Sequence, residues 1–243
     1  MWLVWNSPLR LHLGRGLAFL QLGRGETQIV KFPATLPLIR QLATIDEGLK
    51  HLGNKVPHPR GLEVTLSAAL APAFSFPIPA NVKRWEERRK IAQGVAASRV
   101  GASLEECLCD FDSEHPGIAA SVPVGLYATI QAWAVEHSLK LSSMAPLWAV
   151  ATQCRRIANR RVRSMVIYEP DAVTVAYHAP NGLTDGASWP SEGDIAAGRT
   201  QAAAWLSERG AESRNTAHLA FVAEPTRVDK MCPEVFQAYW NAA

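Results

Sequence analysis

The sequence predicts an α/β fold built from two related halves, the second of them abbreviated. Segments with the alternating apolar pattern of strands take turns with segments of helical spacing along the chain, as in layered α/β domains. A strand–turn–strand pattern also occurs twice, at residues 9–22 and 165–177. Each copy is followed by further strands and helices, so the second half restarts the order of the first.

The first half begins with a hairpin that glycine interrupts. Leu9, Leu11 and Leu13 alternate with other residues, and the apolar pattern resumes after Gly16. Prolines and glycines separate the segments that follow. We expect strands at residues 26–32, 61–70, 104–111, 118–122 and 139–141, and helices at residues 38–52, 81–100, 124–137 and 146–158.

The second half is shorter and begins after a basic tract. Its hairpin at residues 165–177 is followed by a predicted turn at 182–186, a helix at 194–209, a strand at 219–223 and a short helix at 233–240. We therefore divide the chain into residues 1–158, a first half of order β-β-β-α-β-α with further strands and helices, and residues 159–243, a shortened second half.

The bulk composition is that of a globular protein. Of 243 residues, 48% are hydrophobic and 19% are charged, and a net charge of +3 is too small to predict a nucleic-acid partner. No apolar run approaches the roughly 18 residues of a membrane span. The N-terminus lacks the basic start and apolar run of a signal peptide, so we expect a cytoplasmic protein. Four cysteines in this length do not indicate a disulfide framework.

A more specific pattern lies between residues 61 and 151. The segment EVTLS at residues 63–67 leads into a proline-rich bend and a charged helix, and IAASVP at 118–123 then leads into a further helix. Leu139, Leu141 and Pro146 follow. In this order and spacing the chain resembles the actin-fold proteins of type IV pilus and type II secretion machines, namely PilM and the cytoplasmic domain of the type II secretion L protein.

The resemblance, which with the two hairpins covers most of the chain, implies an actin-like ATPase (ribonuclease H-like) fold in two halves. It also implies a cytoplasmic scaffold held at the inner membrane through its partners. PilM relatives bind nucleotide and the short cytoplasmic tail of a single-pass membrane protein. The L-protein relatives hold the secretion ATPase through a domain that lacks several nucleotide-binding features.

Nucleotide binding in this family uses an Asp-x-Gly motif in the hairpin. The Asp organises Mg²⁺, and the Gly lets backbone N–H groups approach phosphate. The matching positions are His12 and Gly14 in the first hairpin and Ile167 and Glu169 in the second, so one glycine survives and neither carboxylate does. A glycine turn expected later falls on Ala-Glu-Pro at residues 223–225. We therefore expect no ATP turnover and no bound nucleotide, metal or other cofactor.

Neither the paired cysteines nor the histidines of this sequence indicate a metal or catalytic site. Cys107 and Cys109 precede several acidic residues, but zinc sites usually place two or more residues between paired thiolates. On a strand these cysteines share one face, so buried thiols are favoured over a metal site. No nucleophile motif accompanies the scattered histidines.

Five arginines crowd residues 155–163. On a helix Arg156, Arg160 and Arg163 share a face, which makes them candidate partner-binding residues. A solvated helix end and a docking surface for an acidic partner or anionic lipid both remain open. Nucleic acid is less favoured, because no aromatic platform accompanies the basic residues.

The sequence thus predicts a non-catalytic scaffold of a bacterial pilus or type II secretion-like machine. We expect it to bind a short cytoplasmic segment of an inner-membrane assembly protein, or an assembly ATPase, at a strand edge or inter-domain groove. The alternative is an active actin-fold ATP-binding protein, either an ATPase or a small-molecule kinase. That alternative needs an acidic metal site, for which Glu169, Asp171 and Asp185 are the nearby carboxylates. An unrelated α/β enzyme would need a catalytic cluster that the sequence does not display.

Overall fold

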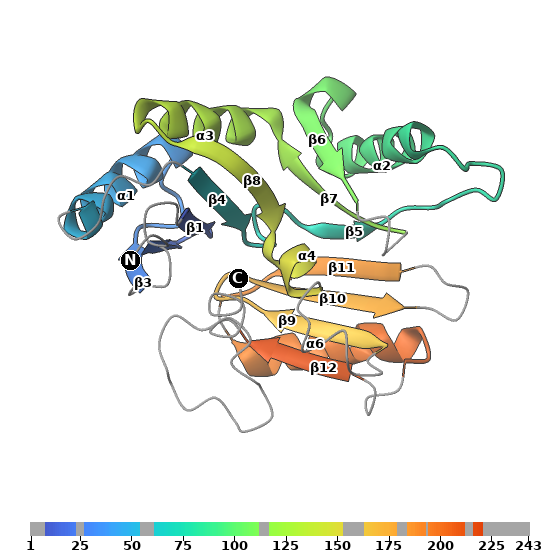
Figure 1. Cartoon of the computed structure of the whole chain (residues 1–243). Helices are drawn as coiled ribbons and strands as arrows, with labels where there is room; N and C mark the ends of the chain where they lie inside the picture. The colour runs from blue at the N-terminus through green and yellow to red at the C-terminus, as the bar shows by residue number, and fades with distance from the viewer. Residues whose placement is uncertain are drawn as a thin grey trace, which may run out of the picture.

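Two β-sheets, one of five strands and one of seven, form the framework of the computed structural model (Figure 1). Each sheet has its own helices, and the hairpin turns of the two sheets meet between them. The structure describes residues 8–22, 27–53, 61–111, 117–152, 163–178, 184–192, 194–211 and 216–220.

The five-stranded sheet has the order β3-β2-β1-β4-β8. Strand β1 pairs antiparallel with β2 and parallel with β4, and β4 pairs parallel with β8. Helices α1 and α3 pack in one apolar cluster with this sheet. The bounds are β1 Leu9–Leu13, β2 Leu17–Leu22, β3 Thr27–Lys31, β4 Gly61–Leu66, β8 Lys140–Pro146, α1 Leu38–Gly53 and α3 Val124–Glu136.

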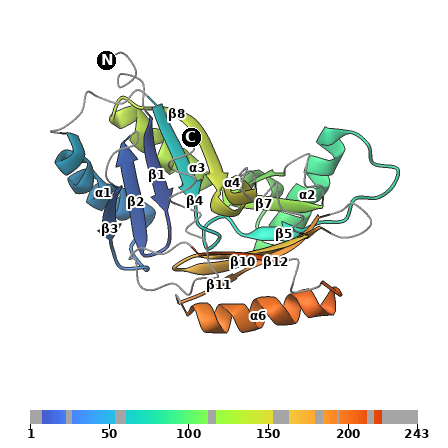
Figure 2. The ribbon, with the colours of Figure 1, turned by 60° about the horizontal axis from the view of Figure 1, so that its bottom comes forward.

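The seven-stranded sheet has the order β12-β9-β10-β11-β5-β7-β6. Helix α2 packs on β6 and β7, and α6 covers the outer face of β9 and β10 (Figure 2). The bounds are β5 Ala73–Ser75, β6 Cys107–Asp110, β7 Ile118–Pro123, β9 Ser164–Tyr168, β10 Ala172–His178, β11 Thr184–Pro190, β12 Thr216–Ala220, α2 Trp85–Val100, the 3₁₀ turn Leu104–Glu106, α4 Leu147–Thr152 and α6 Ile195–Glu208.

Alternation along β1 decides which side chains face its helices. Leu9, Leu11 and Leu13 are buried in one cluster with residues of α1 and α3, because alternate residues of a strand share a face. The intervening His12 has no exposed surface and contacts the Phe19 ring on the other face. Both faces of β1 are therefore buried.

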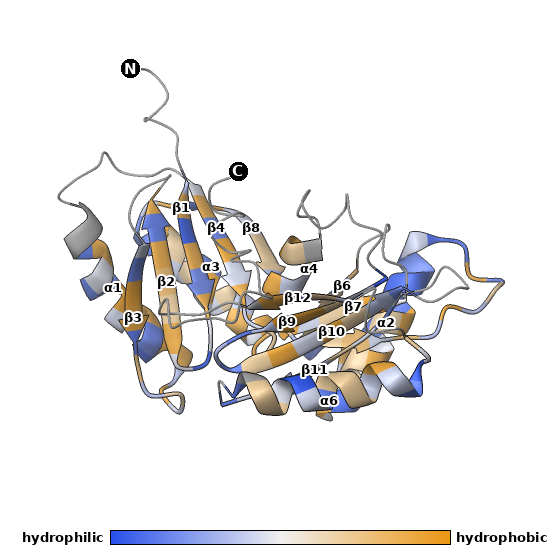
Figure 3. Cartoon of the chain, turned by 90° about the horizontal axis from the view of Figure 1, so that it is seen from below, coloured by the Kyte–Doolittle hydropathy of each residue, from blue (hydrophilic) through white to orange (hydrophobic). Residues whose placement is uncertain are grey.

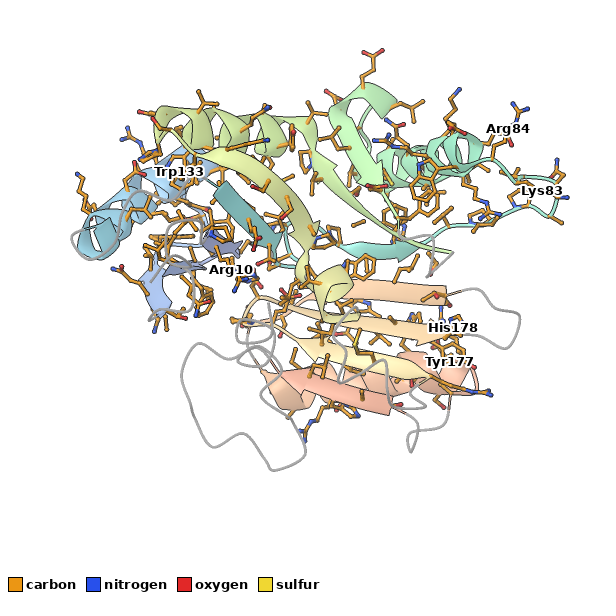
Figure 4. The ribbon with its side chains drawn as sticks, in the orientation of Figure 1. Arg10, Lys83, Arg84, Trp133, Tyr177 and His178 are labelled. Carbon is orange, nitrogen blue, oxygen red and sulfur yellow. The ribbon has the colours of Figure 1, made fainter. Side chains whose placement is uncertain are left out.

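The two helices on this sheet are also joined by a polar contact. Trp133 of α3, labelled in Figure 4, donates from Nε1 to a carboxylate oxygen of Asp46 in α1 over 2.7 Å. The same oxygen lies 3.1 Å from Nε2 of His137. A buried indole N–H needs such an acceptor, so this contact fixes where α3 crosses α1.

Strand β9 is buried on both faces, as expected of a central strand between two helical layers. Val166 and Tyr168 pack beneath α6, whereas Met165 and Ile167 pack on the side of α4. Figure 3, viewed from the side of α6, shows hydrophilic residues along this helix and more apolar strands behind it. Both strands of the second hairpin are therefore buried over nearly their whole length.

Most of the predicted elements are present in the structure. The helices expected at 38–52, 81–100, 124–137 and 194–209 are α1, α2, α3 and α6. Residues 104–106, expected as strand, form a 3₁₀ turn instead. The strand expected at 139–141 extends to Pro146 as β8. The helix predicted at 146–158 appears as α4 up to residue 152, and its remainder and residues 233–240 lie outside the described residues.

Two strands depart from the sequence expectation. The turn predicted at 182–186 is wrong for residues 184–186, which begin β11, and the short β5 has no counterpart in the prediction. Glycine at position 186 leaves room for Ile118, because a Cβ at this position would collide with the Ile118 side chain. A strand glycine that permits close approach thus resembled a turn glycine.

The seven-stranded sheet contains segments from both predicted halves. Strands β5, β7 and β6 precede residue 158, and they continue the sheet of β9 to β12 through the pairing of Phe74 with Ala187. Ser75 strengthens this junction by donating from its hydroxyl to the Gly186 carbonyl over 2.9 Å. The predicted boundary after residue 158 lies in a stretch outside the described residues and stays a prediction.

Candidate functional site

Three turns converge between the two sheets, and we call them the turn cluster: residues 14–16 after β1, residues 67–68 after β4, and residues 169–171 between β9 and β10. Asp171 Oδ2 accepts hydrogen bonds from the Arg15 backbone N–H over 2.6 Å and from the Ser67 hydroxyl over 2.8 Å. The Ala68 N–H lies 3.2 Å from each carboxylate oxygen of Glu169. Every donor comes from the first half and every acceptor from the second hairpin.

The parallel pairing of β1 with β4 brings the two donor turns together. Leu13 is aligned with Leu66, so both strands end at the same edge of the sheet. The Ser67 N–H donates to the Leu13 carbonyl over 2.9 Å and holds the turns at a fixed separation. Loops at the carboxyl ends of neighbouring parallel strands commonly bind ligands in α/β proteins.

Glu169 is the more buried of the two carboxylates, with 3% of its surface exposed. Burial raises its pKa well above the usual range, and the charge of Asp171 raises it further, whereas the hydrogen bond from Ala68 lowers it. Burial dominates, so the uncharged acid is favoured at a higher pH than for an exposed glutamate.

Two of the four positions named from sequence belong to the turn cluster. Gly14 lies in the turn after β1, and Glu169 lies in the turn between β9 and β10. His12 lies two residues earlier, inside β1, where Nδ1 is 3.1 Å from the Thr65 hydroxyl and burial lowers the pKa of the imidazole to about 3. Ile167 is buried under α4. Neither His12 nor Ile167 faces an open cleft.

Ser67, Ala68 and Asp171 complete the turn cluster, and the sequence did not predict this arrangement. Ser67 and Ala68 were assigned to a strand expected at 61–70, and Asp171 was named only as a metal ligand for an active enzyme. Asp185, named with it, instead contacts Ser75 and Arg209 away from the cluster. The available signal was the position of Asp171, a carboxylate in the turn between two mostly apolar strands.

Other candidate residues lie apart from the turn cluster. Arg156 and Arg160, like residues 223–225, lie outside the described residues, while Arg163 is exposed before β9. Cys107 and Cys109 are buried free thiols, as expected, and burial raises the pKa of Cys109 to about 12. Within the described ranges, no three or more His, Cys, Asp or Glu side chains are grouped to hold a metal ion.

A groove of about 500 Å³ lies between the two sheets, on the side of α2 and α3. Its walls are β8 from the five-stranded sheet and β6 and β7 from the seven-stranded sheet. Apolar and small side chains predominate, with Arg89 and Asp110 as the charged residues of its lining. Lys83 and Arg84, labelled in Figure 4, lie beyond it at the outer end of α2.

The groove is bordered by the last strand of each sheet. In the described part of the chain, β8 ends the five-stranded sheet and β6 ends the seven-stranded sheet. A terminal strand presents backbone N–H and C=O groups along one edge, which is a template for an added strand. The edge of β8 is seven residues long, and Lys140, Ser142 and Ser143 on it are exposed.

Among the described residues, no helix combines the length and the apolar composition that a membrane-spanning segment requires.

Sequence comparison alone assigns no relatives to this chain. No protein family's sequence profile matches it, and no curated protein matches it either.

Solved structures do resemble it. An actin-like ATPase-fold protein of unknown function from Bacteroides thetaiotaomicron has a TM-score of 0.61 at 8% identity, covering 92% of this chain and 85% of that one. The cytoplasmic domain of EpsL, an inner-membrane component of the type II secretion system of Vibrio cholerae, has a TM-score of 0.54 at 12% identity, covering 97% and 94%. PilM in a PilM–PilN type IV pilus biogenesis complex has 0.56 at 14%, covering 86% and 67%.

Proposed function

We propose that this chain, which has the actin-like ATPase fold, is a non-catalytic scaffold of a bacterial pilus or type II secretion-like machine. Its task would be to bind a short extended segment of an inner-membrane assembly protein in the groove between β8 and β6. The observation that carries this proposal is the open edge of β8 within a groove of about 500 Å³. The likeness to EpsL and to PilM in a complex with PilN supports the choice of machine.

The groove suits an extended peptide with an apolar sequence. The peptide backbone would pair with the edge of β8, since strand addition takes its affinity from main-chain hydrogen bonds. Small residues on the walls, including Ala120, Ser121, Ser143 and Ala145, leave room for side chains of the occupant. Arg89 and Asp110 offer one charge of each sign for a polar end of the segment.

The turn cluster supports the absence of catalysis. Phosphate chemistry needs free backbone donors and a metal-binding carboxylate. Here the Arg15 and Ala68 N–H groups already bind Asp171 and Glu169, and the two positions expected to carry the metal-binding aspartates are His12 and Ile167, both buried.

A bulky residue in the groove tests the binding site. Ser143→Trp places an indole in the groove from an exposed position of β8, and Gln131→Trp places the same side chain on the exposed side of α3. Each variant is tagged in the native host, cross-linked and purified, and its partners are identified by mass spectrometry. We expect a single-pass inner-membrane assembly protein with wild type and Gln131→Trp but not with Ser143→Trp.

A synthetic peptide then completes this test. The cytoplasmic tail of the captured protein is titrated into each purified variant, and only Ser143→Trp should bind it at least tenfold more weakly. Equal binding by all three proteins would move the partner site elsewhere. Failure to capture any membrane assembly protein with the wild type would contradict the proposed function.

Nucleotide titration separates the scaffold from an active ATPase or kinase. The wild type is titrated with ATP and Mg²⁺ by calorimetry, and phosphate release is measured over hours. We expect no micromolar affinity and no turnover. Turnover that Asp171→Asn abolishes would instead establish the active alternative, in which this carboxylate binds the metal.

A further inference from the structure

The turn cluster has the composition of an anion-binding site whose anion belongs to the chain itself. Backbone N–H groups in turns, aided by a hydroxyl, are donors that proteins commonly present to phosphate and sulfate. The Arg15 N–H and the Ser67 hydroxyl both donate to one oxygen, Asp171 Oδ2, at 2.6 and 2.8 Å. The Ala68 N–H is shared by the two oxygens of Glu169 at 3.2 Å each.

Gly14 shows that the first turn is shaped around this carboxylate. A Cβ on Gly14 would lie 3.0 Å from Asp171 Oδ2, which is tighter than nearly all real Cβ contacts. The backbone of Gly14 does not adopt the left-handed conformation that favours glycine. The absence of a side chain therefore makes room for the carboxylate of Asp171.

The fit is incomplete on the side of the aspartate. Asp171 Oδ1 is buried and has no hydrogen-bond partner among the described residues. The Asp171 backbone is nevertheless held, because its carbonyl accepts the Ser191 N–H over 2.9 Å. The carboxylate thus satisfies donors of the first half while part of its own capacity to accept stays unused.

We infer that Asp171 is a built-in anion that occupies a phosphate-type site of the first half, beside the buried carboxyl group of Glu169, and keeps external anions out. The internal carboxylate joins the two halves at this point. When it is removed, the Arg15 N–H and the Ser67 hydroxyl become available to a free anion such as inorganic phosphate.

Phosphate titration of variants tests this inference. Inorganic phosphate is titrated into wild type, Asp171→Ala and Asp171→Asn at constant ionic strength, and the thermal unfolding midpoint is followed. Ligand that binds only the folded state raises this midpoint. We expect Asp171→Ala to bind phosphate at least tenfold more tightly than wild type. Asp171→Asn should not, since its amide still fills the space.

Glu136→Ala is the charge control, because it removes an exposed carboxylate at the end of α3, away from both the turn cluster and the groove lining. An equal gain in this control, or no gain in Asp171→Ala, would overturn the inference. If Asp171→Ala does not fold, Asp171→Ser replaces it, because its short side chain still vacates most of the space while its hydroxyl accepts from one donor. None of these outcomes depends on the groove, so they are distinct from those that test the proposed function.

A double-mutant cycle provides a second measurement. Gly14→Ala should lower the urea midpoint of the wild type, because the new methyl group meets Asp171 Oδ2 at 3.0 Å. In an Asp171→Ala or Asp171→Ser background the same change should have a much smaller effect. An equal effect in both backgrounds would show that the glycine does not serve the carboxylate.

Discussion

The two hairpins have the same backbone plan and opposite chemistry. In each, the first turn residue donates its N–H to the carbonyl three residues later, from Gly14 to Leu17 over 2.9 Å and from Glu169 to Ala172 over 2.8 Å. The central residues differ. The first turn has Arg15, whose N–H is a donor, whereas the second has Pro170 at the matching position, and proline has no N–H.

The next position differs as well, since Gly16 of the first turn corresponds to Asp171 of the second. In the contact between the two turns, the first hairpin therefore donates and the second accepts. The two turns are thus complementary to each other, because the carboxylate of one accepts the N–H of the other. The comparison teaches that two hairpins with one backbone plan can bind each other when their turn residues differ.

The largest effect is expected from aspartate at the matched strand positions of the two hairpins. Ile167 and His12 are buried at 3% and 0% exposure, so Ile167→Asp and His12→Asp each place a carboxylate in the protein interior. We expect each to cost at least about 4 kcal/mol of unfolding free energy or to prevent folding. Urea denaturation measures the cost.

Conservative variants are the controls for this prediction. Ile167→Val should cost only about 1 kcal/mol, and His12→Asn should be milder than His12→Asp. A folded Ile167→Asp protein of wild-type stability would show that this strand position tolerates the metal-binding aspartate of an active relative.

The two hairpins should also respond to pH in opposite directions. The pKa of Glu169 is raised in the folded state, so its stabilising contribution is complete below the unfolded value of about 4.5 and is lost as the pH rises through the folded pKa. Wild type should therefore lose stability relative to Glu169→Gln by up to about 1.4 kcal/mol per pH unit above 4.5. Urea denaturation at pH 4, 6 and 8 provides the comparison.

His12 has the opposite sign. Burial lowers its pKa to about 3, so stability is present above the unfolded value near 6.5 and is lost as the pH falls toward 3. The free energy of wild type relative to His12→Asn should therefore decline on acidification below pH 6.5. A difference independent of pH for either variant would contradict the assigned protonation state.

The smallest expected effect concerns two hydroxyls at the end of β4. Thr65 contacts His12 of the first hairpin, and Ser67 donates to Asp171 of the second. Ser67→Ala should cost about 1.5–3 kcal/mol because its acceptor is charged, and Thr65→Val about 0.5–1.5 kcal/mol. Thermal or urea unfolding of both variants shows which substitution lowers the free energy of unfolding more. A larger loss for Thr65→Val would indicate that the contact with His12 matters more than the bond between halves.

Local pattern predicted the hairpins because each strand alternates or is apolar over its own length. Comparison with the Asp-x-Gly motif also named Gly14 and Glu169, which the structure places in the two hairpin turns. The partners of these turns depend on strand pairing across long separations, as between Arg15 and Asp171, which are 156 residues apart in sequence. No local rule states that a carboxylate in one turn will meet an N–H in another.

The position of the groove could not be predicted from the sequence either. It arises because β8 and β6 end different sheets, and the seven-stranded sheet itself depends on β11, whose small and polar residues resembled a turn. The actin-like fold was recognised from the order of elements, yet that order does not show which edges remain open.

The mixed seven-stranded sheet has a consequence for how the chain is made. Phe74 of β5 pairs with Ala187 of β11, a partner that emerges from the ribosome only after more than a hundred further residues. Until then β5, β7 and β6 have an unpaired edge on the side of β5, which is a site for aggregation. Such distant pairing also slows folding. The chain is therefore expected to depend most on a chaperone during synthesis, before β11 has emerged from the ribosome.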